Sequence, residues 1–125
     1  MIRLQKNLYK DMVGTTSKYH NQKETIDGIT FDSKKEAKRY QQLKLLEKAG
    51  LIKHLELQKK FPLQAGFKKN GKTYREISYV ADFFYYDNQL HKFIVEDTKG
   101  FRTDVYKIKK KLFEHKYIDF EITEL

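Results

Sequence analysis

The stretch Tyr79–Tyr86, with the sequence YVADFFYY, constrains the fold more than any other part of the chain. It is apolar at odd and even positions alike, apart from Asp82. Because successive side chains of a strand point to opposite faces, such a run predicts a strand covered on both faces. We therefore expect residues 73–87 to form a central strand, in which Asp82 needs a partner to offset its desolvation.

Further strands and turns are predicted on either side of this run. The segment 51–63 alternates in part and predicts an earlier strand, which Pro62 would end. An Asn-Gly pair at 70–71 predicts a turn, and an Asp-Gly pair predicts a short hairpin over 25–31. The C-terminal sequence YIDFEITEL predicts the final strand.

Two helices are predicted from capping signals and periodicity. Ser33 is a good N-cap, and Glu36 three residues later completes a capping-box pattern. This helix extends to about residue 49, with Gly50 as its natural end. A second helix is expected over 103–116. Helical spacing gives it an inner face that would include these residues: Val105, Ile108, Leu112, flanked by Tyr106 and Phe113, with Lys109 inside the arc.

The expected order of elements is helix, three strands, helix, strand. This order predicts an α/β (α+β) fold with a central mixed sheet flanked by helices. At 125 residues, the chain has the length of one domain. We expect a basic N-terminal arm over residues 1–20 and a single domain over 21–125.

The composition points to a polyanionic partner. The chain carries 26 Lys and Arg against 17 Asp and Glu, a net charge of +9, which favours nucleic acid over a merely solvated surface. It has no cysteine, which favours a reducing cytoplasm, and no apolar run of membrane-spanning length. We expect a cytoplasmic protein with no membrane partner.

The hairpin after Tyr86 is expected to bring charged groups together. Its second strand contains IVEDTKG, in which Asp97 and Lys99 share one face and Glu96 points to the other. A loop of two to four residues would place Asp82 opposite a residue between 95 and 97, where facing side chains lie about 5 Å apart. If Asp82 and Asp97 converge, a divalent cation is the usual reason for both to stay ionised.

Each of these signals also has a purely structural interpretation. The capping box explains Glu36 completely, and a salt-bridged strand end would explain Asp97 with Lys99. The lysines of the second helix suit a solvated face as well as a DNA backbone. Asp82 is the hardest to explain structurally, because strand interiors disfavour Asp. No P-loop, GxGxxG or metal-type histidine spacing is present.

Four segments in this order resemble the PD-(D/E)XK nuclease superfamily: DGITFDSKKEAKRYQQLKLLEKAGLIKHLELQKKFPL, YVADFFYY, VEDTKG and TDVYKIKKKLF. More closely, they resemble small phage-encoded endodeoxyribonucleases akin to Holliday-junction resolvases, over about residues 20–125. The resemblance implies a restriction-endonuclease-like core. One departure is that Ala81, and not proline, precedes Asp82.

The resemblance also implies roles for individual residues. Asp82 and Asp97 would hold Mg²⁺, for which Mn²⁺ would substitute, with the backbone carbonyl of Thr98 as a further ligand. Lys99 would orient the attacking water and stabilise charge on the phosphate. Glu36 would be a catalytic acid, either a metal ligand or a neighbour of one. Residues expected to contact DNA or to support the site are Gln58, Tyr106, Lys109 and Lys110.

The implied activity is Mg²⁺-dependent hydrolysis of phosphodiester bonds in branched DNA, during phage replication or recombination. A phage or prophage origin would place the protein in the cytoplasm of a bacterial host. Resolvases that cut two symmetric strands are typically dimers, so a homodimer is also expected. The alternative is a non-catalytic basic DNA-binding or architectural module, which would explain the charge but not Asp82.

Overall fold

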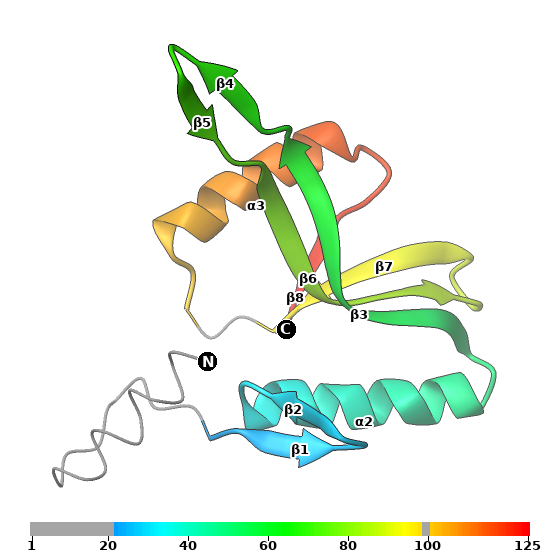
Figure 1. Ribbon diagram of the computed structural model, residues 1–125. Coiled ribbons are helices and arrows are strands. Elements are labelled where there is room, and N and C mark those ends of the chain that lie inside the picture. The colour runs from blue at the N-terminus through cyan, green and yellow to red at the C-terminus, as the bar shows by residue number, and fades with distance from the viewer. Residues whose placement is uncertain (1–21, 99–100) are drawn as a thin grey trace, which may run out of the picture. The chain divides into compact units, whose positions relative to one another are not determined.

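The computed structural model describes residues 22–98 and 101–125 (Figure 1). The expected arm over residues 1–20 lies outside the described residues. The chain divides into two compact units, residues 1–38 and 39–125, and helix α2 (Lys34–Lys48) contains the boundary between them. Each unit is described by itself.

A short hairpin occupies the described part of the first unit. Strands β1 (Glu24–Ile26) and β2 (Ile29–Phe31) pair antiparallel, as the sequence predicts. The two turn residues, Asp27 and Gly28, have φ angles of 54° and 76°. Positive φ at both positions is typical of the type I′ turn, whose twist matches that of the flanking strands.

Helix α2 begins and ends where its capping residues predict. The backbone amide of Glu36 donates to Ser33 Oγ at 3.1 Å, which is the expected N-cap bond. At the other end Gly50 has a φ of 80°. The amides of Gly50 and Leu51 donate to the carbonyls of Glu47 and Leu46, so the last turn closes with a left-handed glycine cap.

The second unit is built on a four-stranded sheet in the order β3-β6-β7-β8. Its strands are β3 (Ile52–Gln64), β6 (Ile77–Asp87), β7 (Lys92–Asp97) and β8 (Ile122–Glu124). Only the β7–β8 pair is parallel, so the sheet is mixed, and the α+β class with a central mixed sheet is confirmed. Neither described helix is long and apolar enough to cross a membrane.

Two predicted strand limits are wrong. Pro62 lies inside β3, opposite Ser78, and does not end the strand. Proline is tolerated there because β3 is an edge strand, so its missing amide interrupts no second ladder. The central strand starts at Ile77, not residue 73, because residues 72–74 form β5 (Lys72–Tyr74) and pair with β4 (Phe67–Lys69) in a separate hairpin.

An aromatic cluster fills the space between the sheet and helix α3 (Asp104–Lys116), which runs across one face of the sheet (Figure 1). Phe61 is at its centre, with ring centroids 5.5 Å from Phe84 and 5.1 Å from Phe113, both edge-on. β6 is one of the two inner strands of the sheet, and it has buried side chains at odd and even positions, as expected. The buried cluster comprises Phe61, Tyr79, Ala81, Phe84, Val95, Tyr106, Phe113 and Ile122.

Helix α3 has the predicted limits but presents a different face to the sheet. Thr103 is its N-cap and accepts the amide of Tyr106. The expected inner residues are exposed, to 62% at Val105, 60% at Ile108 and 43% at Leu112. Tyr106 and Phe113 are buried instead, because two aromatic rings remove more apolar area from water than the aliphatic stripe would.

This orientation predicts that two alanine substitutions on α3 will lower the free energy of unfolding by very different amounts. Phe113→Ala removes a fully buried ring and should lower the free energy of unfolding by about 3–5 kcal/mol. Ile108→Ala, the matched control on the exposed side, should change it by less than about 0.5 kcal/mol. Urea denaturation measures both. The reverse ranking would place the aliphatic stripe against the sheet.

Candidate functional site

The register of the β6–β7 hairpin sets the positions of the two candidate carboxylates. Asp87 pairs with Lys92 across a loop of residues 88–91, and the ladder runs to Phe83 opposite Glu96. Asp82 and Asp97 are the next residues along the two strands, just beyond this last pair of the ladder. The sequence predicted a partner between 95 and 97, and the observed register belongs to the longest loop considered.

Asp82 is held by polar groups from strand β3 and from Thr98, the residue just after β7. Its Oδ2 accepts hydrogen bonds from the backbone amide and the hydroxyl of Thr98, both at 2.8 Å. Its Oδ1 accepts a longer bond from Gln58 Nε2 at 3.3 Å. Asp82 is half-buried, so these donors offset a desolvation that is only partial.

Asp97 is buried at the end of β7, with 3% of its surface exposed. Tyr79 donates its hydroxyl to Asp97 Oδ2 at 2.6 Å. The pKa of Tyr79 is raised above its usual value of 10, first by burial and then by this bond to Asp97. The charge of Asp82 raises the same pKa further, so both carboxylates act on one phenol group.

Gln58 adopts a backbone conformation that is uncommon for its residue type. Its φ angle is 53°, in the left-handed region, although it lies inside β3. Such a conformation costs about 1–3 kcal/mol and persists only where the surrounding structure imposes it. The structure places Gln58 beside Asp82, where a hydrogen bond joins their side chains.

Glu96, next to Asp97 in sequence, belongs to the opposite face of the sheet. Arg39 Nε and Nη2 donate to its two carboxylate oxygens at 2.8 and 2.5 Å, and Tyr85 donates its hydroxyl to the same group. The bond to Glu96 is the main reason that the pKa of Arg39 is raised. Strand parity predicted this separation, and the partners of Glu96 explain why it is buried without facing Asp97.

Glu124 is a residue of this region that the sequence did not single out. It lies opposite Asp97 in the parallel β7–β8 ladder. Tyr106 donates its hydroxyl to Glu124 Oε2 at 2.6 Å, and Arg102 Nε and Nη2 donate to Oε1 at 3.0 and 2.5 Å. The only sequence signal for Glu124 was its place in a strand after the second helix. Its position beside Asp97 depends on the parallel pairing of β8 with β7, two strands that a helix connects.

The remaining predicted residues divide into three groups. Tyr106 donates its hydroxyl to Glu124, which lies opposite Asp97, and burial, this bond and the charge of Asp97 all raise the pKa of Tyr106. Lys109 is half-buried on α3 and Lys110 forms an ion pair with Glu114 at 2.8 Å; no contact with Asp82 or Asp97 is found for either lysine among the described residues. Glu36 is 8% exposed and lies in the first unit, and Lys99 lies outside the described residues.

The donor atoms at Asp82 and Asp97 fit a hard cation such as Mg²⁺. In residues 22–98 and 101–125 no group of three or more His, Asp or Glu side chains is arranged to hold a metal ion. Mg²⁺ is commonly held by one or two carboxylates, with water and substrate phosphates as its other ligands. The carboxylates of Asp82 and Asp97 could satisfy that requirement. Thr98, next to Asp97 in sequence, contacts Asp82 through its backbone amide and its hydroxyl.

The comparison with protein families defines the class to which the chain belongs. The model of the DUF1064 family, described as a protein of unknown function, matches residues 16–125. The chain therefore belongs to the DUF1064 family, and the matched range includes the whole β6–β7 hairpin. No curated protein and no solved structure matches the chain.

The buried ion pair between Arg39 and Glu96 predicts a large effect of removing one partner. Arg39→Met leaves the carboxylate of Glu96, 2% exposed, without its cation and should cost on the order of 3 kcal/mol in the free energy of unfolding. The double variant Arg39→Met/Glu96→Gln removes the buried charge and should recover part of that loss. Urea denaturation of both variants tests this, and equal stabilities would contradict it.

The carboxylate of Glu124 predicts a specific acid dependence of stability. Hydrogen bonds from Arg102 and then Tyr106 lower its pKa from 4.5 to about 2. Since the folded-state pKa lies below the unfolded one, the stabilisation is fully present above about pH 4.5 and is lost as the pH falls towards 2. Wild type should exceed Glu124→Gln in stability at neutral pH, and the difference should vanish across that window. A difference that does not change with pH would contradict this assignment.

Proposed function

We propose that this chain is a metal-dependent DNA endonuclease that hydrolyses phosphodiester bonds, with Asp82 and Asp97 as the ligands of Mg²⁺ or Mn²⁺. The observation that carries the proposal is the hairpin register, which places Asp82, in the middle of β6, and Asp97, at the end of β7, directly beyond the last residue pair of their ladder. The restriction-endonuclease-like core and the resemblance of YVADFFYY and VEDTKG to PD-(D/E)XK nucleases are part of the same proposal.

The contacts of the two carboxylates support this role. Repulsion between neighbouring acids is unfavourable unless a cation or donors offset it. Here each acid has its own donors, Thr98 for Asp82 and Tyr79 for Asp97, which fix the orientation of the oxygens before a ligand arrives. Bound Mg²⁺ would supply Lewis-acid activation of the phosphate and of the attacking water.

Other residues of the chain would act on the substrate directly or support the acids. Lys99 follows Asp97 by two residues, and its ammonium would stabilise the charge that develops on the phosphate. Gln58 would keep Asp82 oriented through its amide. Glu36 is proposed as a further catalytic acid, and Tyr106 as a supporting residue through its hydrogen bond to Glu124.

We further propose branched DNA as the substrate and a homodimer as the active form, within the cytoplasm of a bacterial host. Two-fold symmetric cutting of a four-way junction needs two active sites related by a two-fold axis. The net charge of +9 supports a nucleic-acid partner for this function and for its rival, a non-catalytic DNA-binding module.

Substitution of the two acids separates these functions. Asp82→Asn and Asp97→Asn keep the side-chain shape but remove the charge, so both should reduce Mg²⁺-dependent cleavage of a labelled four-way junction to background. Wild type should also gain thermal stability from Mg²⁺ or Mn²⁺, because the cation binds only the folded chain, and both variants should lose that gain. Lys99→Gln should lower cleavage by about 10²–10³-fold and keep the thermal shift.

The matched control is Asp87→Asn, an acid at the C-terminal end of β6 whose Oδ1 accepts hydrogen bonds from the loop amides of Gln89 and Leu90. It should retain both cleavage and the metal-dependent thermal shift. Full cleavage by Asp97→Asn would contradict the assignment. Binding of the junction without cleavage, in Mg²⁺ or in EDTA, would favour the DNA-binding module; paired symmetric nicks confined to the junction would favour a dimeric resolvase.

A further inference from the structure

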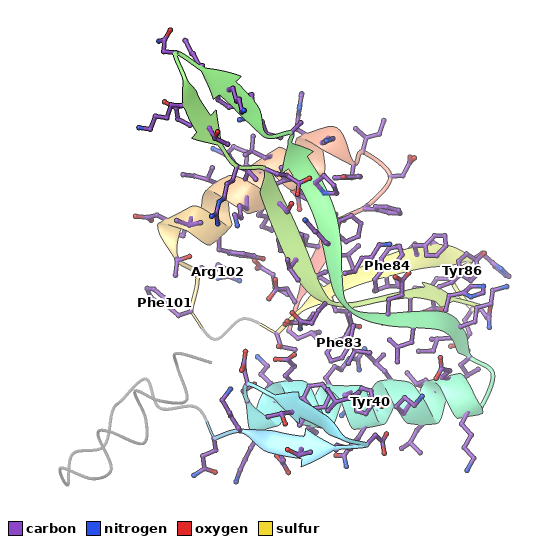
Figure 2. The ribbon with its side chains drawn as sticks, in the orientation of Figure 1. Tyr40, Phe83, Phe84, Tyr86, Phe101 and Arg102 are labelled. Atoms are coloured by element: carbon purple, nitrogen blue, oxygen red, sulfur yellow. The ribbon has the colours of Figure 1, made fainter. Side chains whose placement is uncertain are left out.

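A cleft opens beside α3, separate from the two carboxylates. It has a volume of about 380 Å³ and is lined by residues of α3 from Tyr106 to Glu114 and by Glu124 of β8. Arg102 contributes from the segment just before the helix (Figure 2). The residues that line the cleft are Arg102, Tyr106, Lys107, Lys110, Lys111, Glu114 and Glu124.

The lining is predominantly cationic. Four Lys and Arg side chains face two carboxylates, and those two carboxylates are already engaged, Glu124 by Arg102 and Glu114 by Lys110. Lys107 and Lys111 are exposed and have no acidic partner in the part of the chain that the structure describes. The cleft therefore holds an excess of positive charge that a dianionic or polyanionic group would neutralise.

Arg102 is pre-positioned for an anion by its ion pair with Glu124. Two of its nitrogens donate to Glu124 Oε1, which fixes the plane of the guanidinium. The group carries further N–H donors, and its planar fork matches the oxygens of a phosphate. Since 57% of its side chain is exposed, the guanidinium remains accessible from solvent.

The cleft shares a wall with the carboxylate site. The ring of Tyr106 lies 6.4 Å from the ring of Tyr79, whose hydroxyl donates to Asp97. On the other side, Glu124 stands opposite Asp97 in the β7–β8 ladder. A polymer with regularly spaced phosphates could place one of them at Asp82 and Asp97 and another in the cleft.

We propose that this cleft binds a backbone phosphate of the nucleic acid whose neighbouring phosphate lies at the carboxylates. The assignment rests on the proposed function for the position of the second phosphate. A polymer suits the cleft better than a free phosphate, because Lys107 and Lys111 lie one helical turn apart and extend the cationic surface along α3.

The test measures binding without cleavage, in EDTA, with a fluorescently labelled oligothymidylate and a labelled four-way junction. In the full chain, Lys107→Gln/Lys111→Gln removes two exposed cations of the cleft. The control, Lys48→Gln/Lys92→Gln, removes two exposed cations at the end of α2 and the start of β7. Circular dichroism melts establish that both variants fold.

The expected result is a change in salt dependence. Loss of two phosphate contacts should reduce the slope of log Kobs against log[salt] by about 1.4 for the single strand and about 1.8 for duplex arms, and the control should keep the wild-type slope. Equal slopes in both variants would overturn the proposal. Stabilisation of wild type by inorganic phosphate, with unchanged oligonucleotide slopes in the cleft variant, would overturn the polymer assignment in favour of a free phosphate.

The same variants separate this inference from the proposed function. If wild type fails to cleave the junction with Mg²⁺ but the cleft variant shows the reduced slope, the nuclease proposal fails and a phosphate-binding cleft stands. If wild type cleaves and the cleft variant binds with an unchanged slope, the cleft assignment fails alone.

Discussion

The consecutive buried acids Glu96 and Asp97 impose the strongest physical requirement on this structure. A carboxylate removed from water is costly unless charge or hydrogen-bond donors compensate it. Because strand side chains alternate, the two acids must be compensated on opposite faces of the sheet. Arg39 and Tyr85 do so for Glu96, and Tyr79 does so for Asp97. The end of β7 is therefore fixed from both sides.

This arrangement also explains how two carboxylates are buried at the end of β7. The aromatic cluster around Phe61 excludes water from the face that carries Asp97, and tyrosine hydroxyls supply the donors that solvent would have supplied. Tyr79 and Tyr106 thus have two functions, since each contributes a ring to the core and a hydroxyl to an acid. The raised pKa values of both phenols follow from this double role.

The carboxylate pair and the cationic cleft would meet different requirements of the same polyanion. Acids that hold a hard cation contribute chemistry at one phosphate, whereas lysine and arginine contribute affinity along the backbone. Their shared wall, Tyr106 with Glu124, links the two regions through one hydrogen bond. Such a division is consistent with a strongly basic chain that retains acids at a buried strand end, which a purely DNA-binding surface would not need.

The sequence by itself determined the features that depend on local chemistry and periodicity. Ser33 and Gly50 specify α2, the apolar run through Tyr86 specifies the central strand, and strand parity separates Glu96 from Asp97. Tertiary structure decided the rest, because it depends on contacts between distant segments. The sheet order placed Pro62 on an edge, ring packing turned Phe113 and not Ile108 inward, and the parallel pairing of β8 with β7 brought Glu124 to Asp97.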